Sequence, residues 1–172
     1  LLHARADESY EMAWNKLLVN VPPRSAKSVL VAVLLPAWLW LLDPTLKIRV
    51  VSGHEKLSLK HSGYLRDLLA SAWFRDTFGV GWRVREDRDA AGLFQNTERG
   101  EVRCHTIMSK VIGEGSDVTI MDDPHDSEDA KSEKKRNTVV NRFDNVISNR
   151  VVDPRRNVWI GIMPRLHEAD WA

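Results

Sequence analysis

The amino-acid sequence predicts an α/β protein in which helices cover both faces of a parallel β-sheet. Short apolar runs alternate along the chain with longer segments of helical periodicity, which is typical of parallel strands joined by helices. Most of the strand-like runs are almost continuously apolar, as expected of strands buried on both faces. No internal repeat or low-complexity segment interrupts the alternation.

Five strands and four helices follow from this periodicity. The predicted strands cover residues 17–21, 48–52, 102–106, 118–121 and 158–163. The predicted helices cover residues 8–15, 27–42, 55–72 and 132–149. Residues 80–101 have no clear period and are predicted to form a loop or a polar hairpin. The 14-residue apolar run 29–42 is shorter than the roughly 20 residues of a membrane-spanning helix. We therefore expect a helix that is buried on most faces.

Length and composition indicate one globular domain. The chain has 172 residues, of which 43% are hydrophobic and 28% are charged, which is ordinary for a folded domain. The formal net charge of +1 gives the whole chain no attraction to a polyanion, so any contact with nucleic acid has to be local. Cys104 is the single cysteine and cannot form an internal disulfide, which indicates a reducing compartment. We expect its side chain to be buried as a small apolar group.

The segment VNVPPRSAKS, residues 19–28, has the order of a phosphate-binding loop. In the pattern G-x-x-x-x-G-K-[ST], the lysine meets the β- and γ-phosphates and the hydroxyl binds Mg²⁺. Lys27 and Ser28 match the last two positions, while Val21 and Ala26 stand where the glycines would be. A predicted strand precedes the loop and a predicted helix follows it, as the motif requires.

A pair of acids, Asp122 and Asp123, follows the predicted strand 118–121. Phosphate-loop ATPases need one carboxylate at a strand end for Mg²⁺, and many use the next residue to activate the attacking water. Lys27 and Asp122 are far enough apart in the chain to leave room for the strands 48–52 and 102–106. The sequence therefore predicts a P-loop NTPase of the additional-strand, catalytic-acid type, with ATP and Mg²⁺ as its cofactors.

Two other interpretations of the acidic pair are possible. An Asp-Asp-Pro sequence can simply form the turn that ends a strand. The two acids, His125 and Asp126 can also be ligands of a metal-dependent hydrolase, although further ligands at recognisable spacing are missing. The remaining histidines are scattered and are interpreted as surface or packing residues: His54, His61, His105 and His167.

The predicted helix 132–149 carries apolar residues on one face and basic residues on the other. The basic face comprises Lys131, Lys134, Lys135, Arg136 and Arg142. We interpret it as a solvated helix face, and a contact with the DNA backbone is the alternative.

These motifs together resemble the ATPase domain of the terminase large subunit, the DNA-packaging motor of tailed bacteriophages and prophages. VNVPPRSAKS resembles the Pro-Pro-Arg form of that family's phosphate loop. VIGEGSDVTIMDDPHDSEDAKS is similar to its Asp-Asp-Pro segment, and IGIMPRLHEADW to the strand that carries its coupling motif. KIRVVSGHEKLSLKHSGYLRDLLAS resembles the strand-helix unit between them. The likeness runs from about residue 17 to residue 171.

The resemblance implies a role for each matching residue. The nucleotide-binding residues are Pro23, Arg24, Ser25, Ala26, Lys27 and Ser28. Arg24 stabilises the γ-phosphate, Ser28 and Asp122 hold Mg²⁺, Asp123 activates the water, and Arg165 acts as the coupling sensor. Three positions differ from the usual family pattern: Ala26 replaces a glycine, Asp123 replaces a more frequent glutamate, and Pro164 precedes the sensor arginine.

The resemblance also implies a function. Residues 1–172 would form a single ATPase domain, a fragment without the family's lid and RNase H-like nuclease domain, whose ATP hydrolysis drives double-stranded DNA into a procapsid. The implied partners are DNA, the portal, the small terminase subunit and further copies in a homo-oligomeric ring, in the host bacterial cytoplasm and without a membrane. The alternatives are a degenerate nucleotide-binding assembly module without turnover and a helicase-like DNA repair ATPase.

Overall fold

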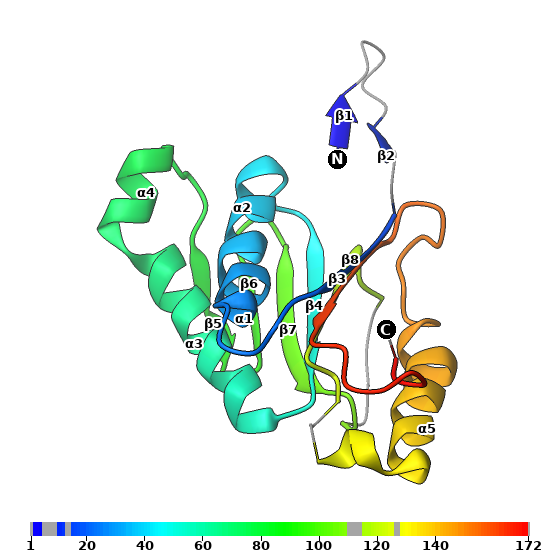
Figure 1. Ribbon diagram of the computed structural model, residues 1–172. Coiled ribbons are helices and arrows are strands. Elements are labelled where there is room, and N and C mark those ends of the chain that lie inside the picture. Colours follow the sequence, from blue (N-terminus) through cyan, green and yellow to red (C-terminus); the bar gives the residue numbers. More distant parts are fainter. Residues whose placement is uncertain (1, 5–9, 13–14, 110–114, 126–127, 172) are drawn as a thin grey trace.

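The computed structural model describes residues 2–4, 10–12, 15–109, 115–125 and 128–171, and it shows an α/β fold (Figure 1). The main sheet has seven strands in the order β3-β9-β8-β4-β7-β6-β5. Its strands are β3 (Lys16–Asn20), β4 (Lys47–Ser52), β5 (Val84–Ala90), β6 (Leu93–Asn96), β7 (Glu101–Thr106), β8 (Val118–Asp122) and β9 (Val158–Met163). The first five in spatial order are parallel, and β6 and β5 are antiparallel. The prediction of a mostly parallel sheet is confirmed.

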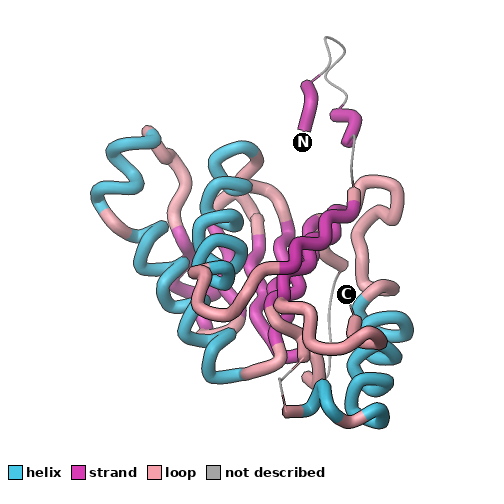
Figure 2. The backbone as a smooth tube through the Cα atoms, viewed as in Figure 1, coloured by secondary structure: helices cyan, strands magenta, loops and turns pink. Residues whose placement is uncertain are grey.

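Helices lie on both faces of the sheet, as predicted (Figures 1 and 2). On one face are α1 (Lys27–Val29), the π-helix η1 (Leu30–Leu34), α2 (Leu35–Leu42), α3 (Glu55–Ala70) and α4 (Ala72–Phe78). On the other face are α5 (Glu133–Arg142) and the π-helix η3 (Phe143–Ile147). A short 3-10 helix, η2 (Asp129–Lys131), precedes α5.

The two helical layers follow from the direction of the strand connections. Parallel crossovers are right-handed, so connections that run in opposite directions along a sheet place their helices on opposite faces. The connection from β3 to β4 runs toward the β5 edge, whereas the connection from β8 to β9 runs back toward β3. Consecutive residues of the central strands accordingly enter different cores: Val50 packs with α3, while Val51 packs with α5.

Aromatic side chains dominate both cores. Trp40 of α2 is fully buried, meets Trp82 and Phe94 edge-to-face, and donates its indole N–H to the carbonyl of Leu46. On the other face, Phe143 packs edge-to-face against Trp159 and Trp171. Such pairs add to the free energy of burial, by about 0.5–1.5 kcal/mol each.

The long helix 27–42 forms as predicted, with the π-helical turn η1 in its middle. Pro36 is the second residue of α2, and the carbonyl with which a helical proline ring clashes, that of Ala32, belongs to this π-helical turn. Most residues of the helix are buried or half-buried, as predicted, and one stripe of apolar side chains is exposed. Leu30, Leu34, Trp38 and Leu42 are 58%, 48%, 49% and 51% exposed. No helix in the described ranges is long and apolar enough to cross a membrane.

Two other predicted helices differ in the structure, and the predicted hairpin is confirmed. Residues Tyr10–Met12 of the predicted helix 8–15 form strand β2, which pairs with β1 (Leu2–Ala4), and residues 8, 9, 13 and 14 lie outside the described residues. So short a segment fits the period of a helix as well as that of a strand, and pairing with β1 makes it a strand. The helix 55–72 ends at Ala70, because the hydroxyl of Ser71 accepts the N–H of Phe74 and starts α4. Residues 80–101 contain the hairpin β5–β6, which confirms the polar hairpin.

The basic face of helix 132–149 is only partly solvated, so this interpretation needs a correction. Arg136 is buried and donates to the carbonyl of Ala130. Arg142 donates to the carbonyls of three consecutive residues, Ile107, Met108 and Ser109. Both guanidinium groups donate to backbone carbonyls within the fold, and lysines form the rest of this basic face.

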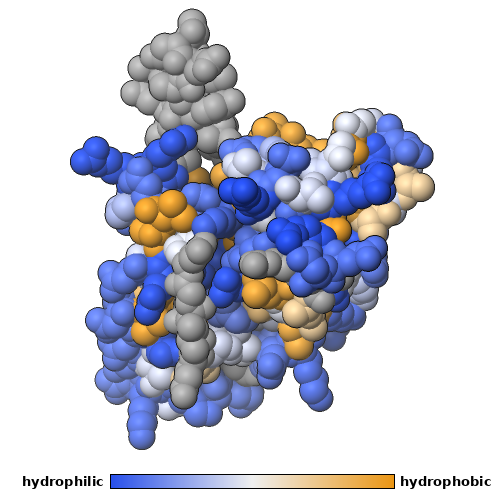
Figure 3. All heavy atoms as spheres, turned by 180° about the vertical axis from the view of Figure 1, so that it is seen from behind, coloured by the Kyte–Doolittle hydropathy of each residue, from blue (hydrophilic) through white to orange (hydrophobic). Residues whose placement is uncertain are grey.

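Much of the surface seen from behind is hydrophilic, with separate apolar areas (Figure 3).

Two glycine-to-alanine substitutions are expected to change stability in opposite directions. A Cβ on Gly161 would come 2.5 Å from the ring of Trp171, so Gly161→Ala should lower the free energy of unfolding by about 1–3 kcal/mol. Gly63 lies inside α3 with open space around it, so Gly63→Ala should raise that free energy by roughly 0.5–1 kcal/mol. Chemical denaturation measures both; equal stability of Gly161→Ala and the wild type would show that Trp171 does not pack against β9.

Candidate functional site

Four parallel strands end side by side at one edge of the sheet. The strand register places Asn20 beside Met163, and Asp122 beside both Ile162 and Ser52. The crossovers that leave β3 and β8 cover opposite faces, and open α/β sheets bind ligands in the crevice at such a switch point. The strand between β3 and β8 is β9, the last in sequence, whereas β4 and β7 lie beyond β8.

The loop between β3 and α1 starts at this edge. The N–H of Val21 donates to the carbonyl of Met163 at 3.2 Å, which ties the loop to the end of β9. Arg24 and Ala26 have left-handed backbone conformations, with φ of 63° and 58°. That conformation costs an L-residue roughly 1–2 kcal/mol, and glycine would adopt it without this cost. Ala26 therefore adopts, at the cost of strain, a backbone conformation that a glycine at this position would adopt without it.

The two sequence motifs meet at the start of α1. Lys27 Nζ lies 2.9 Å from Asp123 Oδ2, and the lysine side chain is only 8% exposed. Ser28 Oγ donates to Asp122 Oδ1 at 2.9 Å, which joins residues 94 positions apart. The structure thus brings the lysine, the hydroxyl and both carboxylates together.

The backbone of Asp123 is held on both sides. Its φ is 47°, its N–H donates to the carbonyl of Ile162 at 3.0 Å, and its carbonyl accepts the N–H of Gly53 at 2.9 Å. A Cβ on Gly53 would come 2.7 Å from that carbonyl, so only glycine allows this approach. Among the described residues, Asp123 Oδ1 is buried and has no hydrogen-bond partner. A buried carboxylate oxygen of this kind is suited to accept a hydrogen bond from a ligand or water.

Burial dominates the electrostatics of Asp122, whose side chain is 1% exposed. Burial raises the pKa of Asp122 to about 6, with a further increase from the charge of Asp123, while the Ser28 hydrogen bond and Lys27 oppose the shift. His61 Nδ1 of α3 lies 3.9 Å from Asp122 Oδ2. Burial and the neighbouring charge of Lys60 lower the pKa of His61, which keeps its imidazole neutral near pH 7.

The oxygen atoms of Ser28 and Asp122 fit Mg²⁺. Magnesium prefers hard oxygen ligands and is usually bound by one or two protein groups together with phosphates and waters. The described residues contain no group of three or more His, Cys, Asp or Glu side chains that could hold a metal by themselves. His125 Nε2 accepts the N–H of Trp171 at 3.0 Å, and Asp126 lies outside the described residues. The alternative of a metal-dependent hydrolase therefore gains no support.

The two predicted arginines lie in the loops that follow β3 and β9. Arg24 is exposed and, within the described ranges, makes no hydrogen bond or ion pair; its loop neighbours Pro23 and Ser25 are also exposed. Arg165 follows β9, and its guanidinium contacts Asp170 at 3.6 Å and the carbonyl of Glu168 at 3.0 Å. The structure does not bring Arg165 into a described contact with the lysine or the two carboxylates, and its role as a sensor stays a prediction.

Sequence reasoning missed two residues of the site, Gly53 and His61. Gly53 directly follows β4, and a glycine at the end of a buried strand is a signal for close backbone approach. The sequence predicts a surface or packing role for His61 and gives no signal for its position, because the packing of α3 against β4 and β7 determines which strand end it faces.

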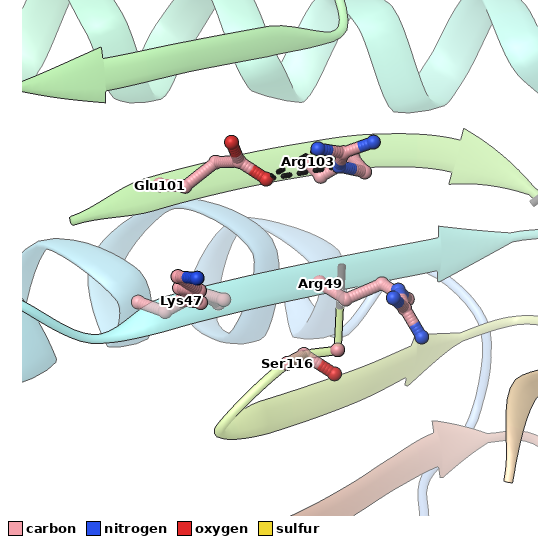
Figure 4. A pocket seen from close by; sticks show the side chains of 7 residues that line it. Lys47, Arg49, Glu101, Arg103 and Ser116 are labelled. Carbon is pink, nitrogen blue, oxygen red and sulfur yellow. Dashed lines mark hydrogen bonds and ion pairs between the residues drawn. The ribbon is translucent and has the colours of Figure 1, made fainter. Parts of the chain in front are cut away.

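A small pocket lies near the amino ends of β4 and β7 and is separate from this site, which lies at the carboxyl ends of the strands. Its lining includes Lys47, Arg49, Glu101, Arg103 and Ser116 (Figure 4). Lys47 and Glu101 begin β4 and β7, whereas Asp122 ends β8. Arg49 is buried, and burial together with Arg103 and Arg150 lowers its pKa to about 10.

Cys104 is buried, as predicted, and burial raises the pKa of its thiol to about 12.

Comparison of the chain with models of protein families and with curated proteins finds no match.

The buried carboxylate predicts a pH-dependent gain in stability for Asp122→Asn. The folded-state pKa of about 6 lies above the ordinary value of 3.8, so ionisation of Asp122 destabilises the fold. This cost is absent below about pH 4, grows as the pH rises through 6, and is then on the order of 2 kcal/mol. Thermal denaturation should therefore show Asp122→Asn melting above the wild type at pH 8 and together with it at pH 4. The exposed Asp76→Asn is the control, and a gain independent of pH would contradict the assignment.

Proposed function

We propose that this chain is a P-loop ATPase of the additional-strand, catalytic-acid type, which binds Mg²⁺–ATP at the carboxyl edge of β3, β9 and β8. The single observation that carries the proposal is the convergence of Lys27 with Asp123 and of Ser28 with Asp122. A strand between the phosphate-loop strand and the acidic strand supports the additional-strand type. The left-handed turn at Ala26 supports a phosphate-binding loop.

In this proposal, the triphosphate lies against the loop 21–26 and the first turn of the helix that begins at Lys27. Backbone N–H groups at a helix start, together with the helix dipole, favour phosphate oxygens. Lys27 exchanges its ion pair with Asp123 for the β- and γ-phosphates, and the exposed Arg24 contributes a second positive charge. Ser28 and Asp122 hold Mg²⁺, which supplies charge neutralisation on the phosphates.

Asp123 then acts on the attacking water. Once Lys27 has turned to the phosphates, the carboxylate of Asp123 accepts a hydrogen bond from the water and orients its oxygen toward the γ-phosphorus. A bond forms between the water oxygen and phosphorus, the bond to the bridging oxygen of ADP breaks, and the proton leaves through Asp123. The buried Oδ1 without a partner supports this role.

The resemblance of the motifs to the terminase large subunit supports a more specific proposal. In it, ATP hydrolysis drives double-stranded DNA into a viral procapsid, with portal, small subunit and a ring of identical chains as partners. Phosphate release should then increase when double-stranded DNA is added to the assembled ring. Tight Mg²⁺–ATP binding without release under the same conditions would favour the nucleotide-binding assembly module instead.

Lys27→Ala should abolish nucleotide binding and turnover, because the ammonium group is the main cation for the phosphates. We expect Mg²⁺–ATP to raise the melting temperature of the wild type and of the exposed control Lys134→Ala, but not that of Lys27→Ala. Phosphate release should be lost in parallel. Unchanged turnover in Lys27→Ala would refute the proposed site.

Asp123→Asn should separate binding from catalysis. The amide cannot accept the proton of the water, so turnover should fall by about 10²–10⁴-fold. Binding of Mg²⁺–ATP should persist, because the loop, Lys27, Ser28 and Asp122 remain. Phosphate release and calorimetric binding measured on the same preparation decide this. Equal losses of affinity and rate would argue against a role for Asp123 in activating water.

A further inference from the structure

Asp122 is held differently at its two carboxylate oxygens. Oδ1 accepts the Ser28 hydroxyl at 2.9 Å, whereas Oδ2 faces Nδ1 of His61 at 3.9 Å. Because Asp122 is 1% exposed, its carboxylate cannot turn into solvent. Its orientation, and with it the oxygen that faces Ser28, therefore depends on these two neighbours.

His61 comes from a rigid part of the fold. It lies in the 16-residue helix α3, which packs against β4, β7 and η1, and it is 6% exposed. Its ring meets the ring of Tyr64 at a centroid distance of 6.3 Å. Buried imidazoles are usually hydrogen-bonded, and the structure places Asp122 Oδ2 3.9 Å from Nδ1. The present separation exceeds hydrogen-bond length by less than 1 Å.

The contact is attractive for only one arrangement of the proton. A bare Nδ1 would direct its lone pair at the carboxylate oxygen, so the proton has to reside on Nδ1. Catalytic hydrogen bonds are often long before the ligand binds and become shorter in the complex. A movement of the Asp122 carboxylate toward His61 by less than 1 Å would bring Oδ2 within hydrogen-bond distance of Nδ1 while Oδ1 still faces Ser28.

We propose that His61 is a positioning residue for Mg²⁺, whose Nδ1–H holds Oδ2 of Asp122 so that Oδ1 stays directed at Ser28 and the metal. The inference rests on the proposed function and extends it to a residue outside both motifs. Side chains that orient a metal ligand in this way commonly change metal affinity about 10–100-fold when they are removed. His61 would do so without touching nucleotide or metal.

Three variants separate positioning from packing. His61→Leu removes the donor, and we expect it to raise the Mg²⁺ concentration for half-maximal ADP binding about 10-fold. His61→Asn keeps an N–H at the place of Nδ1 and should restore that concentration to within about 3-fold of the wild type. Tyr64→Leu, on an exposed residue that contacts the His61 ring, disturbs the packing alone and should leave it unchanged. Calorimetry with ADP, with and without Mg²⁺, provides the readout, and affinity without Mg²⁺ should be the same in all variants.

A second measurement is independent of nucleotide. In a double-mutant cycle of thermal unfolding, His61→Leu and Asp122→Asn should shift the melting temperature non-additively, because each removes one side of the same contact. Additive shifts, or equal Mg²⁺ dependence in His61→Leu and the wild type, would overturn the inference. If the wild type bound no nucleotide while the cycle remained non-additive, the proposed function would fail and the contact between His61 and Asp122 would stand.

Discussion

The ion pair between Lys27 and Asp123 requires that two strands distant in sequence end at the same edge of one sheet. β3 delivers the lysine through a short loop, and β8 ends directly at the acids. β9 lies between them and binds both sides: its Met163 carbonyl accepts from Val21, and its Ile162 carbonyl accepts from Asp123. Because parallel strands share a direction, the one strand between β3 and β8 determines how far apart the two motifs lie along the ends of the strands.

Backbone strain and the burial of a carboxylate at the site lower the free energy of unfolding, and the rest of the fold has to offset this loss. Arg24, Ala26 and Asp123 adopt left-handed backbone conformations, and Asp122 buries a carboxylate whose pKa is thereby raised to about 6. Such strain and desolvation persist only where the surrounding structure holds them in place. The aromatic core around Trp40 and the fully buried central strands provide that support.

On the opposite face of the sheet, Trp171 connects the acidic segment with the residues that follow β9. Trp171 packs on Gly161 and Phe143, and its backbone N–H donates to Nε2 of His125, two residues after Asp123. Asp170 accepts from the N–H groups of Leu166 and His167, which fixes the turn that carries Arg165. Asp123 is therefore connected, through Pro124 and His125, to the loop that carries Arg165.

The sequence by itself determined the class of fold and both motifs. Largely apolar runs identify β8 and β9, and shorter apolar stretches identify β4 and β7. Lys27-Ser28 and Asp122-Asp123 stand out because each comes after a strand-like run. Local patterns report local structure, since hydrophobic periodicity depends on which face of an element is buried. The same patterns failed at residues 8–15, where pairing with β1 decided the outcome, and they did not show which stripe of helix 27–42 is exposed.

Only the tertiary structure decided which strands are neighbours and which side chains meet. The place of β9 between β3 and β8, the approach of Gly53 to Asp123, and the position of His61 opposite Asp122 depend on non-local packing. The assignment of Arg136 and Arg142 to backbone carbonyls has the same origin. Contacts between elements far apart in the chain leave no periodic trace in either element, because each element's pattern records that a face is buried and not what buries it.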